Sequence, residues 1–170
     1  MARLTTKLLI ATAVLATAAC TTKREEALPP APVGSQAPGY QQPTTGNAII
    51  PGSAADFLRS VTSDTIHFAL DQFDIDPEAR AILDSQSAWL TKYPNVRVTI
   101  EGHCDERGTR EYNLALGDRR ANAAKNYLAA RGVSPMRITT ISYGKERPIA
   151  LGSDEASWAQ NRRAVTIVIN

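Results

Sequence analysis

Alternation between apolar and polar positions divides the chain into a patterned region from Ser53 onward and an unpatterned region before it. In the patterned region, short alternating apolar stretches predict strands, and apolar residues that recur every three or four positions predict helices. Strands are predicted over residues 65–68, 96–100, 138–143 and 164–169, and helices over 54–61, 76–93, 110–131 and 155–160. After the first short helix the order is β-α-β-α-β-(α)-β, which predicts an α+β fold with a mixed sheet covered by helices.

The two long predicted helices have clear start and stop signals. Asp76 suits the capping position of the first, Pro77 suits its first turn, and Pro94 ends it. The second, over residues 110–131, ends at Gly132. Because each long helix connects two strands, we expect some of the strands to pair in parallel.

The first twenty residues follow the three-part pattern of a secretory signal peptide. Arg3 and Lys7 make the start positive, residues 8–16 are apolar, and small residues precede Cys20. The apolar run is short for a membrane span, although an uncleaved anchor is the alternative. The small residues before the cysteine resemble the lipobox of bacterial lipoproteins. That resemblance implies a signal peptide over residues 1–19, cleavage before Cys20 and lipidation of this cysteine.

Residues 20–52 differ sharply in composition from the rest of the chain. Six of the ten prolines lie there among Ala, Gln, Thr and Gly, and large apolar residues are scarce. Such a segment cannot bury enough apolar surface to offset its ordering entropy, so we interpret it as a disordered tether. About 30 residues reach about 100 Å when fully stretched. Residues 53–64 then form a lead-in segment, and residues 65–170 form the domain proper.

Charge and cysteine content narrow the function further. Without Arg3 and Lys7 the 19 basic residues fall to 17, which equals the number of acidic residues, so net charge does not favour nucleic acid. With Cys20 lipidated, Cys104 is the one free thiol, and an internal disulfide is excluded. An exposed Cys104 would be able to pair between molecules in an oxidising compartment.

Candidate chemistry concentrates in residues 102–121, which read GHCDERGTREYNLALGDRRA. On a helical projection Arg120 falls on the apolar face, where a guanidinium needs a partner. Asp105 and Glu106 lie just upstream. Two interpretations stay open: an internal ion pair between Arg120 and Asp105, or a site for a zwitterionic amino acid group. In such a site the carboxylate would bind the arginine and the ammonium would bind the aspartate.

Other chemistries are disfavoured. Residues 103–106 are four consecutive metal-ligand types, but an extended segment points them in alternating directions, and the chain has two histidines. Ser142 and Lys145 match the S-x-x-K motif of serine acyl enzymes, but here the motif closes a strand. Trp89 and Trp158 are interpreted as packing residues. We therefore expect no metal, no cofactor and no catalytic residues.

Three stretches carry a resemblance to a known family. Residues 102–121, the SYGKERP run from Ser142 to Pro148 and the QNRRAV run from Gln160 to Val165 resemble the OmpA-like C-terminal domain family. The likeness covers roughly residues 65–170 and is to the lipid-anchored branch of the family that works in the Tol system. The outer-membrane barrels of this family would need more strands than the sequence predicts, and its flagellar stator proteins would need a membrane-spanning helix.

The resemblance implies a binding site for the diaminopimelate of the peptidoglycan stem peptide, made by residues matched by position: Asp71, Asp105, Arg107, Asn113 and Arg120. It further implies a non-enzymatic protein of the outer membrane whose domain faces the periplasm and grips the cell wall. Implied roles are envelope integrity and outer-membrane constriction at division, and implied partners are peptidoglycan, TolB and other Tol proteins. The alternatives are a peptidoglycan-modifying enzyme and another OmpA-like cell-wall anchor.

Two positions depart from the family pattern. Leu70 stands where an aromatic residue often precedes the aspartate, so stacking at that position is not expected. Cys104 replaces a residue that is usually small and unreactive, and we interpret it as a tolerated core substitution.

Overall fold

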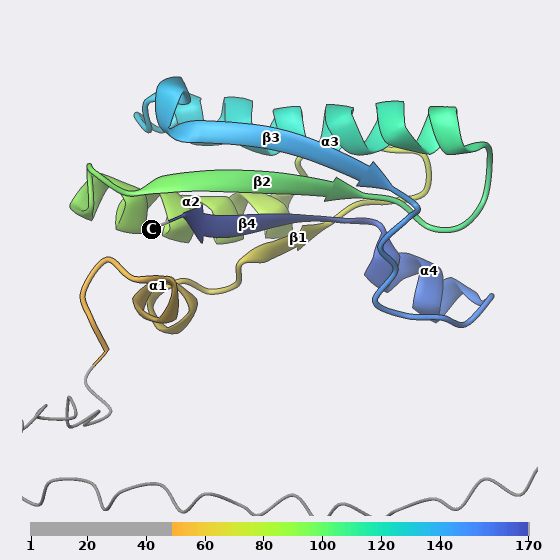
Figure 1. Cartoon of the computed structure of the whole chain (residues 1–170), viewed down its shortest axis with the longest axis horizontal. Helices are drawn as coiled ribbons and strands as arrows, with labels where there is room; N and C mark the ends of the chain where they lie inside the picture. Colours follow the sequence, from red (N-terminus) through yellow and green to blue (C-terminus); the bar gives the residue numbers. More distant parts are fainter. Residues whose placement is uncertain (1–48, 170) are drawn as a thin grey trace, which may run out of the picture. The chain divides into compact units, whose positions relative to one another are not determined.

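The computed structural model describes residues 49–169, and within them the predicted order of elements is confirmed (Figure 1). The helices are α1 (Ala54–Ser60), α2 (Pro77–Lys92), α3 (Arg110–Ala130) and α4 (Glu155–Asn161). The strands are β1 (Thr65–His67), β2 (Arg97–His103), β3 (Ile138–Gly144) and β4 (Arg163–Ile169), and a 3₁₀ turn (Pro135–Arg137) precedes β3. The signal peptide, Cys20 and most of the tether lie outside the described residues.

The four strands form one mixed sheet in the order β1-β4-β2-β3, so the predicted α+β fold class is confirmed. Strand β4 is antiparallel to both β1 and β2, and β2 is parallel to β3. The parallel pair is the one that α3 connects, as expected for a crossover helix. Helix α2 also connects two strands, but β4 lies between them in the sheet (Figure 1).

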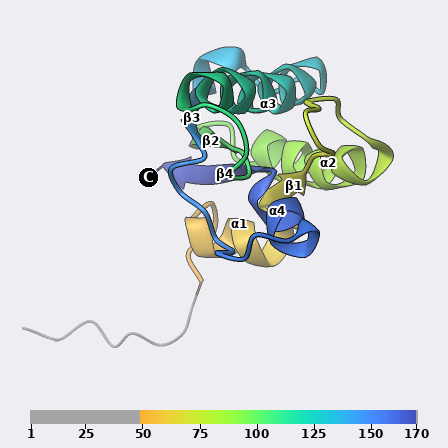
Figure 2. The ribbon, with the colours of Figure 1, turned by 90° about the vertical axis from the view of Figure 1, so that its right-hand side faces the viewer.

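Helices α2 and α3 cover one face of the sheet (Figure 2). The core between these two helices and the sheet includes Leu83, Leu90, Ile100, Leu128 and Ile138. Within residues 49–169, none of the helices has the length and apolar character needed to cross a membrane.

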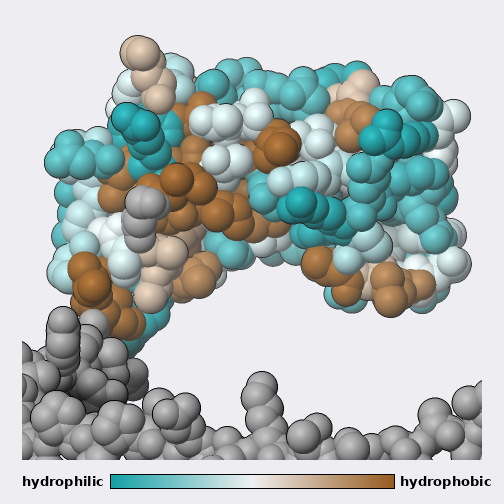
Figure 3. Space-filling view, viewed as in Figure 1, coloured by the Kyte–Doolittle hydropathy of each residue, from teal (hydrophilic) through white to brown (hydrophobic). Residues whose placement is uncertain are grey.

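The opposite face of the sheet is more open. Ile141, Ile167 and Ile169 alternate with the core positions of their strands and are 39%, 37% and 49% exposed. Figure 3 shows apolar residues gathered across the middle of the molecule in this view. The packed core therefore lies on the helix-covered face of the sheet, and the binding site depends on that core and on the ends of the strands.

Strand β2 and helix α3 approach each other closely at two glycines. A Cβ atom on Gly102 would lie 1.8 Å from the carbonyl oxygen of Gly117, and one on Gly117 would lie 2.4 Å from Ser142 Oγ. This approach holds the end of β2 against the first turns of α3. The connecting residues 104–109 therefore leave one fixed element and enter another.

Gly102→Ala is expected to lower the free energy of unfolding by about 1–3 kcal/mol, because the added methyl group would overlap backbone atoms. Urea unfolding measures this loss. Asn126→Ala on the exposed face of α3 is the control, with an expected change below about 0.5 kcal/mol. Equal stability of Gly102→Ala and the wild type would contradict the close approach.

Candidate binding site

Arg120 is fully buried, as its place on the inner face of α3 predicted, but its partners are backbone carbonyl groups. Its Nε donates to the Gln72 carbonyl at 2.8 Å, Nη1 to the His103 carbonyl at 2.8 Å and Nη2 to the Ala69 carbonyl at 3.1 Å. Among the ion pairs of residues 49–169, none joins Arg120 to Asp105. Of the two interpretations left open for Arg120, the internal ion pair with Asp105 is therefore wrong.

The carbonyl contacts of Arg120 have a simple physical reason. Residues 69–72 leave β1 without forming a further strand or helix, so their carbonyl groups need other donors. A guanidinium group has five N–H donors, and three of them serve this loop and the end of β2. Burial lowers the pKa of Arg120 below its ordinary value, but an arginine stays charged at neutral pH. Arg120 thus brings a positive charge into the wall of the site while it fixes the loop.

Asp105 is buried and held by two arginines. Arg107 donates to it from its backbone amide and Nε, both at 3.1 Å, and from Nη2 at 2.6 Å. Arg162 Nη1 lies 3.4 Å from the same carboxylate. Burial alone would raise the pKa of Asp105, but the hydrogen bonds from Arg107 and Arg162 outweigh it and hold that pKa below its ordinary value. Asp105 is therefore a charged carboxylate at neutral pH.

Arg162 is a site residue that sequence reasoning missed. It is 6% exposed, and its Nε donates to the Phe68 carbonyl at 3.0 Å while Nη2 donates to Glu155 at 2.7 Å. The signal was present in the QNRRAV run that contributes to the family resemblance. Two adjacent arginines are usually exposed to solvent, however, and only the fold shows that Arg162 and Arg163 are both buried.

The remaining predicted residues are Asp71, in the loop after β1, and Asn113, in the first turn of α3. Asp71 has a φ of 60°, a left-handed conformation that aspartate tolerates, and its carboxylate accepts a hydrogen bond from the Tyr112 hydroxyl. The Tyr112 side chain is 44% exposed. Asn113 is buried, and its amide donates to the carbonyl groups of Arg107 at 2.7 Å and Thr109 at 2.9 Å. Asn113 therefore closes the loop over residues 104–109.

Lys145 fixes the same loop from the outside. Its ammonium donates to the carbonyl groups of Glu106 at 3.0 Å and Gly108 at 2.6 Å. Ser142, the other residue of the S-x-x-K match, accepts from the Gly144 amide at 3.2 Å. The side chains of Ser142 and Lys145 therefore both form hydrogen bonds to nearby backbone groups.

A cavity of about 120 Å³ brings all five predicted residues together at the carboxyl end of β2. Its lining combines two carboxylates with three guanidinium groups and a few apolar side chains. The lining residues are Leu70, Asp71, Cys104, Asp105, Arg107, Gly108, Asn113, Leu116, Arg120 and Arg162. Because charges of both signs line one small space, the cavity suits a small group that itself carries both charges.

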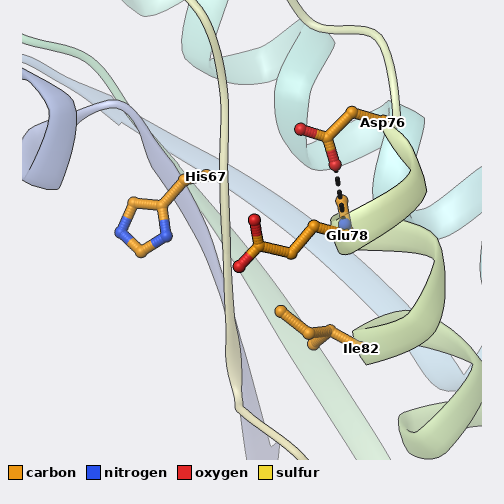
Figure 4. Close-up of a pocket in the computed structure, with 5 residues that line it drawn as sticks. His67, Asp76, Glu78 and Ile82 are labelled. Atoms are coloured by element: carbon orange, nitrogen blue, oxygen red, sulfur yellow. Dashed lines mark hydrogen bonds between the residues drawn. The ribbon is translucent and has the colours of Figure 1, made fainter.

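A larger cavity of about 250 Å³ lies between β1 and α2 and contains none of the five predicted residues; it is lined by His67, Asp76, Glu78, Ala79 and Ile82 (Figure 4). Figure 4 shows the Glu78 side chain turned toward His67, whereas Asp76 accepts from the Ala79 amide at 2.7 Å and so caps α2. Within residues 49–169, no group of three or more His, Cys, Asp and Glu side chains is placed to hold a metal ion. The Asp76 carboxylate is thus already used as the cap of α2. The smaller cavity has more charged side chains in its lining than the larger one.

His103 and Cys104, which begin the charged stretch, both point into the packed structure. His103 is 1% exposed, and its burial together with the charges of Arg163 and Arg147 lowers its pKa to about 4, so the ring is neutral at pH 7. Cys104 is 3% exposed, its thiol donates to the Asn113 carbonyl at 3.3 Å, and burial raises its pKa. A buried, protonated thiol agrees with a tolerated core substitution and not with pairing between molecules.

Fold and cavity together define a class: a small α+β binding domain with a charged cavity at the end of its central strand. The chain belongs to the OmpA family, whose family model matches residues 67–162. The chain is 57% identical over 121 residues to the peptidoglycan-associated lipoprotein of Rhizobium meliloti, covering 71% of this chain and 68% of that protein. Against the peptidoglycan-associated lipoprotein of Pasteurella multocida the identity is 41% over 166 residues, covering 97% and 98%.

One solved structure gives the same assignment. The crystal structure of the peptidoglycan-associated lipoprotein from Burkholderia pseudomallei matches with a TM-score of 0.63 and 41% identity, covering 67% of this chain and 100% of that one. The C-terminal domain of Helicobacter pylori MotB, at 21% identity and a TM-score of 0.59, shares the fold alone. The prediction that the chain is not an enzyme agrees with its family, since the relatives are named for an association with peptidoglycan and not for a reaction.

Proposed function

We propose that this chain is a lipid-anchored, non-enzymatic protein that holds the outer membrane to the cell wall by binding the diaminopimelate of the peptidoglycan stem peptide. The supporting observation is the cavity at the end of β2, where Asp71 and Asp105 lie beside three arginines. The free end of diaminopimelate carries an ammonium and a carboxylate on one carbon. Such a group needs acceptors and cationic donors within a few ångströms of each other, which this cavity offers.

The contacts of the arginines support an assignment of the two ends of the ligand. Arg162 is only 7% exposed through its side chain and is held by Glu155, whereas the Arg107 side chain is 35% exposed. We therefore assign the ligand carboxylate to Arg107, with Arg120 adding positive charge from the cavity wall. The ammonium is assigned to Asp105 and Asp71, whose carboxylates both line the cavity.

Size supports binding of a side-chain end and not of the glycan. A volume of about 120 Å³ is well below the roughly 300–1,000 Å³ of pockets that enclose a drug-sized ligand. A disaccharide would not enter it. The terminal amino acid group of one diaminopimelate has the charge pattern and the small size that the cavity accepts.

The location and partners in the proposal rest on the sequence. Cys20 follows a lipoprotein-type signal peptide, and the similarity to the Pasteurella multocida lipoprotein extends over 97% of the chain. Several acyl chains on Cys20 would anchor the protein in the outer membrane with its domain in the periplasm. The family resemblance supports partners of the Tol system, chiefly TolB, on a surface that overlaps the cavity. It also supports roles in envelope integrity and in outer-membrane constriction at division.

The experiment uses residues 20–170 with Cys20→Ser, which removes the acylation site. This protein should sediment with purified sacculi, release no soluble muropeptides, and be displaced by stem peptide that contains diaminopimelate. A stem peptide with lysine in its place lacks the second carboxylate and should displace it at least about tenfold less well, which corresponds to about 1.4 kcal/mol. Failure to sediment would contradict cell-wall binding, and release of muropeptides would favour the alternative, a peptidoglycan-modifying enzyme.

A further inference from the structure

Helix α4 reaches Asp105 indirectly, through both of the arginines that hold this carboxylate. On one side Glu155 accepts from Arg162 Nη2 at 2.7 Å. On the other side the guanidinium carbon of Arg107 lies 4.0 Å from the centre of the Trp158 ring. Two residues of one short helix therefore support the two arginines that hold the site's buried carboxylate.

The Trp158 ring is itself held in place by the loop that it supports. Its indole N–H donates to Glu106 Oε1 at 3.0 Å, and Glu106 lies between Asp105 and Arg107 in the chain. The ring thus has two contacts with one short loop, one through its face and one through its edge. Two such contacts fix both the position and the tilt of the indole relative to Arg107.

Stacking on an indole determines which donors of Arg107 remain for a ligand. A stacked guanidinium uses its face and keeps its N–H groups in its own plane. Nε and Nη2 of Arg107 bond to Asp105, at 3.1 Å and 2.6 Å. The two N–H groups of Nη1, together with the second N–H of Nη2, are the donors that this arrangement leaves for a carboxylate that enters the cavity.

We propose that Trp158 is a positioning residue of this site: it holds Arg107 so that one edge of the guanidinium stays on Asp105 and Nη1 stays available to the ligand carboxylate. The proposal rests on the proposed function, because it names a further residue of the same site. It also revises the interpretation of Trp158 as a packing residue only. Trp158 contributes to affinity through Arg107 and does not itself touch the ligand.

The first test is calorimetric titration of the diaminopimelate-containing stem peptide into residues 20–170 with Cys20→Ser. Trp158→Leu should weaken binding by about three- to tenfold, the range expected for loss of a partly exposed cation–π contact. Trp158→Phe keeps an aromatic face and should recover most of this affinity. An unchanged affinity in Trp158→Leu would overturn the proposal, and so would a loss in Trp158→Phe as large as that in Trp158→Leu.

The second test separates positioning from general support of the fold. In an Arg107→Ala background, Trp158→Leu should change affinity by less than about twofold, because the residue through which Trp158 acts is gone. A further loss as large as that in the wild-type background would show that Trp158 acts through the fold, and would overturn the proposal. If the unsubstituted protein binds neither sacculi nor the peptide, it is the proposed function that fails.

A matched control is available on α3. The guanidinium carbon of Arg131 lies 5.1 Å from the centre of the Tyr127 ring near the C-terminal end of α3, and neither residue lines the cavity. Tyr127→Leu removes an aromatic partner of an arginine in the same way. Its affinity for the peptide should stay within about twofold of the unsubstituted protein, even if its melting temperature falls. A loss as large as that in Trp158→Leu would assign the effect to stability and overturn the proposal.

Discussion

Arg120→Leu is expected to lower the free energy of unfolding by about 3–5 kcal/mol. The guanidinium of Arg120 bonds to the carbonyl groups of Ala69, Gln72 and His103, and leucine would leave all three without this donor. A carbonyl group that is left without a donor, in a place that water reaches poorly, destabilises the folded state by the free energy of the missing hydrogen bond. Because the loop over residues 69–72 would lose its attachment to β2, sacculus binding should fall as well. Urea unfolding followed by circular dichroism measures the loss of stability.

The control for this substitution is the neighbouring residue. Arg119 is exposed on the same helix, with its guanidinium carbon 5.6 Å from the centre of the Phe73 ring. Arg119→Leu should change stability by less than about 1 kcal/mol, since it removes only a solvated charge and an exposed contact. If Arg120→Leu instead kept full stability and lost sacculus binding, the N–H groups of Arg120 would serve the ligand and not the loop.

The ends of the helices could be predicted from sequence because they depend on local contacts. Asp76 accepts from the Ala79 amide at 2.7 Å, and Ser53 accepts from the Asp56 amide at 3.2 Å, as their positions before a helix indicate. The place of β4 between β1 and β2 could not be predicted in the same way. Strand order depends on pairing between strands that lie far apart in the sequence, and β4 is the last strand of the chain but pairs with both β1 and β2.

The site shows a similar division between what sequence reveals and what it does not. The helical projection placed Arg120 on the inner face of α3, and the burial of its side chain confirms that placement. Its partners could not be predicted, because backbone carbonyl groups exist at every residue and leave no signal in the sequence. The burial of Arg162 depends on Phe68 and Asp105, which lie 94 and 57 positions away in the chain. Such distant contacts are visible only in the folded structure.

Asp105→Asn is expected to abolish most sacculus binding while the domain stays folded. The substitution keeps the size of the side chain and one acceptor oxygen for Arg107 and Arg162, but it removes the negative charge that we assign to the ligand ammonium. Loss of a buried charge partner costs about 2–5 kcal/mol of binding, so affinity should fall at least about thirtyfold. Sedimentation with sacculi measures the binding, and a melting curve shows that the fold is kept.

The control is a carboxylate with similar partners elsewhere in the domain. Asp84 on α2 pairs with Arg131 at 2.9 Å and accepts from the Tyr127 hydroxyl at 2.9 Å, so Asp84→Asn removes a held charge without changing the cavity lining. Its sacculus binding should match that of the wild type. Equal binding by Asp105→Asn would show that Asp105 only orders the two arginines.

Acid titration of the wild type gives an independent check on the role assigned to Asp105. Hydrogen bonds from Arg107 and Arg162 hold the pKa of Asp105 below its ordinary value, so the carboxylate stays charged at pH values where a free aspartate is already protonated. The stability and binding that depend on this charge are complete above about pH 4 and are lost as pH falls through the lowered pKa. Binding that instead weakened between pH 7 and 5 would indicate a group other than Asp105. The Asp105→Asn variant lacks this titration and should show weak binding that does not change across the same range.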